Sequence, residues 1–196
     1  MSQQLEIEFK NMLTNQEYLQ LLQEFSIDTN DIYTQINYYL DTQDFSLMQA
    51  KSALRVREKN GYYTLTLKQP VKAGVLETNQ RISIEEFDVI KKIGRIPNGA
   101  VNEVIKQIGI ATDSLTLLGN LKTNRVSFPY KEGKLFLDHS MYLNKEDFEL
   151  EYEVEDREIG NSLFLALLNS YHIPVRNTDN KIIRFFTEKK KQQSSI

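Results

Sequence analysis

The sequence contains no cysteine and only two histidines, His139 and His172, among its 196 residues. The absence of cysteine excludes disulfide bonds, thiolate catalysis and cysteine metal sites. Two histidines do not supply the several imidazoles of a histidine-based zinc site. Any metal must therefore bind mainly to carboxylates, which are the protein ligands that Mg²⁺ and Mn²⁺ prefer.

Long apolar runs are also absent. No segment is long enough to cross a bilayer, and the first residues lack the apolar core of a signal peptide. The net charge of −3 argues against a general nucleic-acid or membrane-surface binder. There is no internal repeat and no linker rich in proline, glycine or serine. We therefore expect a cytoplasmic protein with one domain over residues 1–188 and a solvated tail over residues 189–196.

Short runs rich in β-branched and aromatic residues dominate the chain and predict strands. The predicted strands cover residues 6–10, 32–42, 52–58, 62–70, 74–84, 115–130, 134–143, 148–155 and 180–188. Between the third and fourth runs, Asn60 and Gly61 are typical of a two-residue hairpin turn.

Four amphipathic helices interrupt these strands. Three of them have predicted N-terminal caps at Thr14 with Glu17, Ser83 with Glu86, and Asn98. The fourth is predicted from an apolar stripe over residues 158–171. Eight or nine strands with a few helices indicate an α+β protein with a large antiparallel sheet.

Charged and apolar side chains alternate along the predicted strands. In residues 6–10 (EIEFK), Glu6, Glu8 and Lys10 share one face of the strand. The same alternation recurs later, and the charge is sorted by strand, with carboxylates and cations in different runs. The later charges on these faces are Arg55, Arg57, Lys68, Arg125, Asp138, Glu149 and Glu151.

Two interpretations of the charged faces remain open from the pattern alone. In most antiparallel sheets the polar face meets water. Alternatively, a curved sheet turns this face inward, where buried charge is tolerated only if it is paired, hydrated or bound to ions. Carboxylates beside a group of arginines and lysines would then suit a polyphosphate with its divalent metal ion, because arginine matches phosphate geometry.

The order of these residues resembles the CYTH superfamily of triphosphate tunnel metalloenzymes, and most closely its bacterial YjbK-like branch. EIEFK resembles the ExExK signature, and the resemblance continues to about residue 185. The matching later segments are LRVR at 54–57, TLK at 66–68, TNR at 123–125, Asp138, ELE at 149–151 and Lys181. The resemblance implies an eight-stranded antiparallel β-barrel that holds a phosphate chain, with amphipathic helices packed outside.

The resemblance also implies roles for individual residues. The metal-side carboxylates would be Glu6, Glu8, Asp138, Glu149 and Glu151. The phosphate-binding cations would be Lys10, Arg55, Arg57, Lys68, Arg125 and Lys181. The general base is left open among Glu6, Glu8 and Glu151.

The predicted activity is hydrolysis of a triphosphate, with inorganic triphosphate as the preferred substrate and Mg²⁺ or Mn²⁺ as the cofactor. Alternatives are hydrolysis of a nucleoside triphosphate or thiamine triphosphate, and cyclisation of a nucleotide by an adenylate cyclase. A non-catalytic sensor of polyphosphate or a phosphorylated ligand and a plain interaction domain also remain open. The predicted partner is a small phosphate compound, not a nucleic acid or a membrane.

Several charged residues have no settled place in this scheme. Either Glu77 or Arg81 could be the charged residue expected after Lys68. On a straight strand, Lys181 and Arg184 would point to opposite faces, and we favour Lys181. We expect Glu153 and Glu155, near a strand end, to be solvated, His139 to face away from Asp138, and His172 to lie at a helix end.

Overall fold

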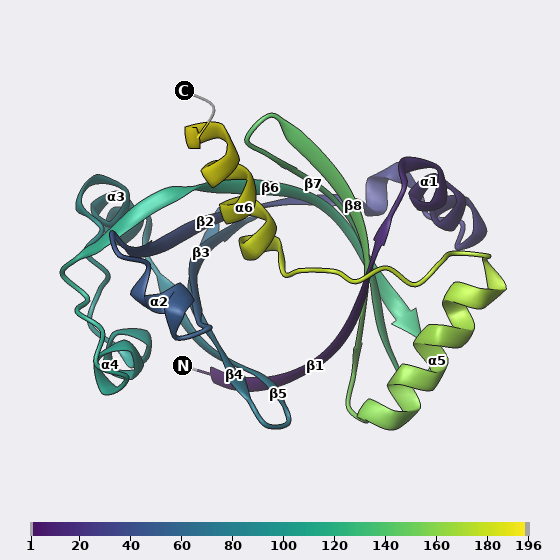
Figure 1. Cartoon of the computed structure of the whole chain (residues 1–196), viewed down its shortest axis with the longest axis horizontal. Coiled ribbons are helices and arrows are strands. Elements are labelled where there is room, and N and C mark those ends of the chain that lie inside the picture. The colour runs from purple at the N-terminus through teal and green to yellow at the C-terminus, as the bar shows by residue number, and fades with distance from the viewer. Residues whose placement is uncertain (1, 195–196) are drawn as a thin grey trace. The chain divides into compact units, whose positions relative to one another are not determined.

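The structure is a computed structural model that describes residues 2–194. Over these residues, eight strands pair in the closed antiparallel barrel order β1-β5-β4-β3-β2-β6-β7-β8, together with six α-helices (Figure 1). The strands are β1 (Ser2–Leu13), β2 (Tyr33–Thr42), β3 (Ala53–Lys59), β4 (Tyr62–Val71), β5 (Gly74–Ile82), β6 (Leu115–Tyr130), β7 (Gly133–Tyr142) and β8 (Lys145–Val154). The α+β barrel prediction is confirmed.

The helices are α1 (Asn15–Glu24), α2 (Ser46–Gln49), α3 (Ile84–Ile93), α4 (Ala100–Gln107), α5 (Arg157–Ser170) and α6 (Lys181–Ser194), with a short 3₁₀ turn at Thr29–Asp31. Helices α1 to α4 lie between strands, and α5 and α6 follow β8. Within residues 2–194, no helix is long and apolar enough to span a membrane.

The chain forms two compact units. Unit 1 comprises the chain up to Leu5 and Gln35–Leu121, and unit 2 comprises Glu6–Thr34 and the chain from Lys122 onward. Strands β1, β2 and β6 each contain residues of both units.

In unit 1, the apolar side chains of β3 and β4 pack under α3 and α4. Leu54, Val56, Leu65 and Leu67 are fully buried in a core that also contains Phe87 of α3. Because side chains alternate along a strand, the arginines of β3 and the lysine of β4 lie on the face away from these helices.

Unit 2 repeats this arrangement with different helices. Leu137 and Leu150 are fully buried against Leu21 of α1 and Leu167 of α5. Figure 1 shows α1 and α5 on one side of β8 and α6 on the other side. The carboxylates of β7 and β8 therefore face α6 rather than the apolar core.

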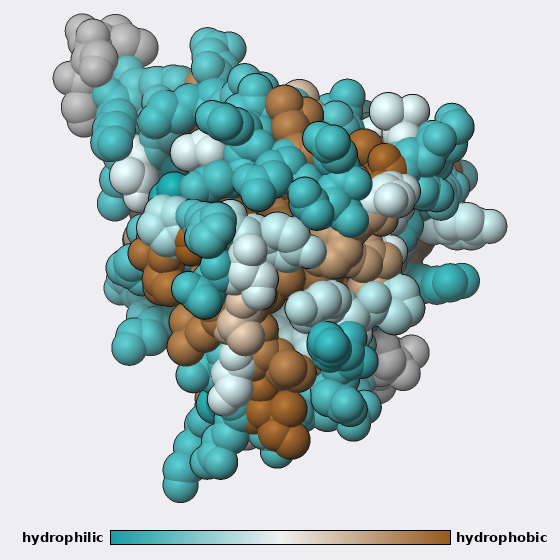
Figure 2. Space-filling model, turned by 90° about the vertical axis from the view of Figure 1, so that its right-hand side faces the viewer, coloured by the Kyte–Doolittle hydropathy of each residue, from teal (hydrophilic) through white to brown (hydrophobic). Residues whose placement is uncertain are grey.

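The outer surface over α1 and α5 is mixed in character. Figure 2 looks onto this side and shows apolar side chains interrupted by hydrophilic ones. Leu19 of α1 and Ile159 and Leu165 of α5 are among the exposed apolar residues. Scattered exposed apolar side chains of this kind are ordinary on protein surfaces.

The two predicted capping boxes are present. The Thr14 hydroxyl accepts from the Glu17 backbone and the Glu17 carboxylate accepts from the Thr14 backbone, which starts α1. Ser83 and Glu86 start α3 in the same way. Gly94 ends α3 with a φ of 70°, a left-handed conformation that glycine adopts without strain.

The expected cap at Asn98 is wrong, because Gly99 precedes α4 instead. The Gln80 side chain lies over this helix end, and its Oε1 accepts from the Val101 backbone at 3.4 Å. A Cβ atom at Gly99 would lie 2.5 Å from that oxygen. Glycine therefore allows a side chain from β5 to take the capping role.

The strand predicted over residues 180–188 is also wrong, because residues 181–188 belong to α6. Phe185 and Phe186 are buried, and with Ile182 they have the i, i+3, i+4 spacing of a helix face. Their β-branched and aromatic neighbours are equally common in strands. The tail expected from residue 189 is helical through Ser194, and residues 195–196 lie outside the described residues.

The segment between α5 and α6 is tied to β1 by the buried Asn11. Its amide donates to the Pro174 carbonyl at 3.1 Å, and its Oδ1 accepts from the Arg176 backbone at 2.6 Å. Thr178 adds a third tie by accepting from the Met12 backbone at 2.9 Å. These bonds fix where α6 begins.

We predict that Asn11→Ala destabilises the protein by about 1–3 kcal/mol, because it removes a fully buried amide side chain and takes its partner from the Pro174 carbonyl and the Arg176 backbone amide. Urea unfolding followed by circular dichroism measures this change. The exposed Asn161→Ala of α5 is the matched control and should stay within about 0.5 kcal/mol of the wild type. Equal stability of the two variants would contradict the role of Asn11.

Candidate functional site

A buried group of carboxylates lies on the face of β7 and β8 that α6 covers. Asp138, Glu149 and Glu151, here called the acidic cluster, each offer an oxygen within 4.8 Å of the others. Asp138 and Glu149 are direct partners across the two strands. All three side chains were predicted as metal-side carboxylates, and the structure brings them together.

Arg125 of β6 neutralises part of this cluster. It binds Asp138 through two parallel hydrogen bonds of 2.6 Å and reaches Glu151 at 2.5 Å. Burial works to raise the pKa of Glu151, but Lys181 and Arg125 hold it well below its usual range. Glu151 is therefore ionised in the folded protein at neutral pH.

Two cations from the first turn of α6 complete the pairing. The Lys181 ammonium contacts Asp138 at 2.8 Å and Glu151 at 2.6 Å, and it also binds Glu149. Arg184 donates to Glu149 at 2.9 Å and to Asp147 at 3.0 Å. The expectation that only Lys181 reaches this face is wrong, because residues three apart lie on the same side of a helix.

The acidic cluster has the chemistry of a site for a hard divalent cation. Its ligands are carboxylate oxygens only, which suit Mg²⁺ or Mn²⁺. Among the described residues, Glu149 Oε1 is buried and has no hydrogen-bond partner. Buried acceptors rarely lack a partner, so this oxygen fits a ligand atom for an ion.

A second row of carboxylates lies where β1 pairs with β8. Glu8 is directly opposite Glu153, and Lys10 is opposite Glu151. Lys10 donates to Glu8 at 2.7 Å. Burial raises the pKa of Glu153 to about 7, and the negative charges of Glu6 and Glu151 add to this rise. Glu8 and Glu153 therefore form a second group of carboxylates beside Lys10, and Glu6 is close enough to act on Glu153.

Glu153 is the site residue that the sequence analysis missed. It is half-buried, whereas Glu155 is exposed, as expected. The alternation along residues 148–155 placed Glu153 on the charged face, but only the pairing register puts it opposite Glu8. Register between strands far apart in the sequence cannot be read from periodicity.

Unit 1 carries a group of cations on the charged face of β3 and β4. Arg55, Arg57 and Lys68, here called the cationic cluster, lie around the Glu77 carboxylate of β5. Glu77 accepts from Arg55 at 3.2 Å and from Lys68 at 2.5 Å. Among the described residues, the buried Arg55 Nε has no hydrogen-bond partner and so can serve an anion.

Glu77 and Arg81 were both candidates for the charged residue expected after Lys68. In the structure, both side chains lie on the charged face of β5. Thr64 is opposite Arg57 on one side and Arg81 on the other, and Lys68 is opposite Glu77. Burial works to raise the pKa of Glu77, but Arg55 and Lys68 lower it to about 2.

The two histidines lie away from these clusters, as expected. His139 stacks on Phe148 with ring centroids 4.5 Å apart, and its Nε2 is 2.7 Å from a Glu146 oxygen. His172 lies just after α5 and has a φ of 57°. Both residues have structural or surface positions.

Comparison with known proteins gives consistent matches over nearly the whole chain. The CYTH domain family matches residues 4–186. The chain is 45% identical to "Putative triphosphatase YjbK" of Bacillus subtilis over 192 residues, which cover 97% of this chain and 99% of the relative.

Solved structures show the same likeness. A structure described as a "putative adenylate cyclase" from Bacillus halodurans matches with a TM-score of 0.92 and 38% identity, covering 95% of this chain and 100% of that one. "Putative adenylyl cyclase HpAC1" from Hippeastrum, whose description gives it a dominant triphosphatase activity, has a TM-score of 0.78 and 23% identity, with 93% and 96% covered. At 23% identity, this second likeness supports the fold alone.

We predict that Lys181→Met lowers the free energy of unfolding by about 3–5 kcal/mol, because it leaves buried carboxylates without their cation. Added Mg²⁺ or Mn²⁺ should raise the melting temperature of this variant more than that of the wild type, since the ion replaces the lost charge. Differential scanning calorimetry with and without EDTA measures both effects. The exposed Lys190→Met of the same helix should behave like the wild type; equal metal responses of all three proteins would contradict the prediction.

Glu77 should contribute to acid sensitivity. Its lowered pKa stabilises the fold above the unfolded value of about 4.5, and this stabilisation is lost as pH falls towards 2. A shift of this size corresponds to about 3 kcal/mol. We predict that Glu77→Gln is less stable than the wild type at pH 7 and shows a shallower loss between pH 5 and 2.

Urea unfolding at several pH values tests the role of Glu77. The control is Glu24→Gln, which removes an exposed carboxylate from the end of α1 and should leave the pH profile unchanged. A parallel shift of the Glu77→Gln profile, without a change of slope, would contradict the assignment.

Proposed function

Because this chain belongs to the CYTH family, we propose that it hydrolyses a phosphoanhydride bond of a triphosphate with the help of a divalent metal ion. Inorganic triphosphate is the preferred substrate, and Mg²⁺ or Mn²⁺ the preferred ion. The observation that carries the proposal is the buried acidic cluster, in which Glu149 Oε1 has no hydrogen-bond partner among the described residues. The name of the Bacillus subtilis relative supports the same reaction class.

We assign the metal to carboxylates of unit 2. The residues that would hold it are Asp138, Glu149, Glu151, Glu6 and Glu8, and the pairing register adds Glu153. A bound divalent ion would polarise the reacting phosphoryl group and activate a water molecule. The pairing of Glu8 with Glu153 across β1 and β8, and the effect of Glu6 on the pKa of Glu153, support including these three residues.

The cations would bind and orient the phosphate chain. The proposed phosphate-binding residues are Arg55, Arg57 and Lys68 in unit 1, and Lys10, Arg125 and Lys181 in unit 2. Arginine presents a planar fork of donors that matches phosphate oxygens. The unpartnered Nε of Arg55 supports its role, because an incoming anion would satisfy this buried donor. Such contacts would hold the phosphate chain in line for the reaction and stabilise the charge of the transferring phosphoryl group.

Hydrogen bonding favours Glu8 over Glu151 as the general base. Both oxygens of Glu151 are already engaged, one by Arg125 and the other by Lys181. Glu8 has one oxygen bound by Lys10, which leaves its other oxygen to accept a proton from water. We therefore propose Glu8 as the base and Glu151 as a residue that positions the ion and the cations.

Nucleotide cyclisation is the second candidate function. The relative from Bacillus halodurans, which is 38% identical, is described as an adenylate cyclase. Cyclisation and hydrolysis can share metal-binding and phosphate-binding residues, because both reactions break a phosphoanhydride bond. The products distinguish them: hydrolysis of inorganic triphosphate releases phosphate, and cyclisation of ATP releases pyrophosphate with a cyclic nucleotide.

We predict that the purified protein releases phosphate from inorganic triphosphate with Mg²⁺ or Mn²⁺ and releases none in EDTA. Turnover of ATP and thiamine triphosphate should be slower, with no cyclic AMP formed. A colorimetric phosphate assay and chromatography of the nucleotides measure these products. Tight binding of triphosphate without release would support a sensor instead, and cyclic AMP formation would support the cyclase.

Replacing the proposed base should remove activity without unfolding the protein. We predict that Glu8→Gln lowers kcat on inorganic triphosphate by about 100-fold or more, which is the usual contribution of a general base. The matched control is Glu155→Gln, which removes an exposed glutamate just after β8 and should retain wild-type kcat. Similar kcat values for the two variants would exclude Glu8 as the base.

A further inference from the structure

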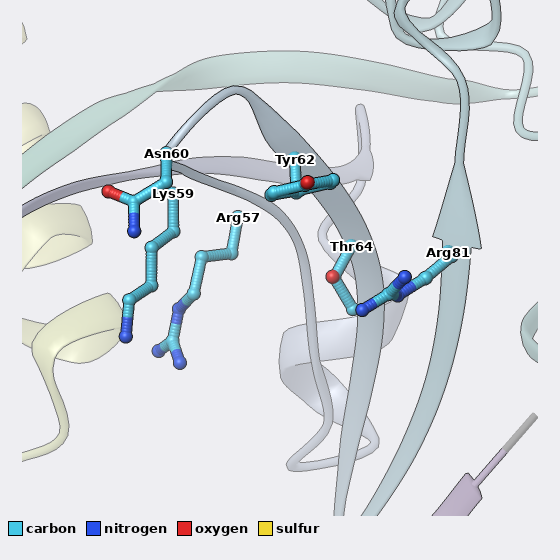
Figure 3. A pocket seen from close by; sticks show the side chains of 6 residues that line it. All are labelled: Arg57, Lys59, Asn60, Tyr62, Thr64 and Arg81. Atoms are coloured by element: carbon cyan, nitrogen blue, oxygen red, sulfur yellow. The ribbon is translucent and has the colours of Figure 1, made fainter.

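Unit 1 contains a pocket at the turn between β3 and β4. It has a volume of about 260 Å³ and is lined by Arg57, Lys59, Asn60, Tyr62, Thr64 and Arg81 (Figure 3). Taken over the described residues, this lining carries three cations and no carboxylate. Figure 3 shows the charged ends of Arg57 and Lys59 side by side, while Arg81 reaches from β5 towards Thr64.

The pocket continues the cationic cluster along the strands. Arg55, Arg57 and Lys59 lie on the same face of β3, each about 6.6 Å beyond the one before. Thr64 extends the row to β4 and Arg81 extends it to β5. The pocket therefore begins at Arg57, where the proposed phosphate-binding residues end.

The hairpin turn gives the pocket a defined wall. Asn60 and Gly61 both have positive φ, at 51° and 75°, as a tight two-residue turn requires. The turn holds Lys59 directly opposite Tyr62. The Arg81 guanidinium lies 5.7 Å from the centre of the Tyr62 ring, so the exposed ring supports this cation at the rim.

We propose that this pocket binds the phosphate groups by which a linear polyphosphate extends beyond the triphosphate, so that chains of four or more phosphates bind more tightly. The inference rests on the proposed function, since it needs the triphosphate to lie on the cationic cluster. Three cations, a hydroxyl and an amide are donors for phosphate oxygens. A nucleoside fits less well, because the volume lies below the roughly 300–1,000 Å³ typical of pockets for drug-sized organic groups.

Binding measurements with chains of defined length test this proposal. Isothermal titration calorimetry in EDTA, which prevents turnover by the proposed mechanism, compares inorganic triphosphate, tetraphosphate and ATP on the full chain. We expect tetraphosphate to bind about 10-fold more tightly than triphosphate, and ATP not to share this gain. In Lys59→Gln, the affinity advantage of tetraphosphate over triphosphate should fall to about 3-fold or less, while the affinity for triphosphate stays within about 2-fold of wild type. The double variant Lys59→Gln/Arg81→Gln should bind tetraphosphate no more tightly than triphosphate.

The control variant Lys92→Gln/Lys106→Gln removes the same number of charges from exposed helix positions of unit 1 and should keep the full gain. Failure to bind triphosphate both in EDTA and with Mg²⁺ would overturn the proposed function itself. Triphosphate binding without a gain for tetraphosphate, or a gain that survives in Lys59→Gln/Arg81→Gln, would overturn only the role of the pocket. Tighter binding of ATP that Tyr62→Ala abolishes would assign the pocket to a nucleoside instead.

Discussion

Pairing of buried carboxylates with buried cations is the constraint on which unit 2 depends. Asp138 and Glu149 are fully buried, and an unpaired charge in that position is strongly destabilising. Arg125 and Lys181 supply the opposite charge at hydrogen-bond distance, and Lys181 can do so only if α6 lies on this face of the sheet. The bonds from Asn11 to the segment before α6 therefore serve the same end, because they fix the start of the helix that carries these cations.

The charged strand faces of the two units differ in sign. Cations dominate this face in unit 1, and carboxylates dominate it in unit 2. In unit 1, one carboxylate, Glu77, lies among several cations, and its low pKa reflects their field. In unit 2, carboxylates of β1 and β8 lie close together, and the raised pKa of Glu153 reflects its burial first and then the charges of Glu6 and Glu151. Both faces have the same origin, since in each unit apolar residues at alternate strand positions pack under helices. A metal-bound polyphosphate offers a divalent ion to carboxylates and anionic groups to cations, which is the chemistry that the proposed function assigns to each of these faces.

Local signals in the sequence were enough to predict the strands that form the barrel and both capping boxes. The charged faces were also predictable, because alternation decides which side chains share a face. The sequence could not decide the state of residues 180–188, where Ile182, Phe185 and Phe186 suit a strand by composition and a helix by spacing. That one difference moved Arg184 onto the acidic cluster. Glu153 was missed for a different reason, since its neighbour Glu8 comes from a strand about 145 residues away, and only register brings the two together.

Lys181 connects the stability of the fold with its proposed chemistry. An ammonium group has three donors, and in this structure Lys181 contacts one oxygen from each residue of the acidic cluster. It therefore cannot bind a phosphate through the same hydrogen atoms without giving up a carboxylate. Under the proposed function, a divalent ion that binds the acidic cluster would take over the charge balance that Lys181 now provides, and the ammonium would be released to phosphate. Metal binding and phosphate binding would then be coupled through one side chain at the start of α6, so that a residue that pairs with buried carboxylates could also belong to the proposed substrate site.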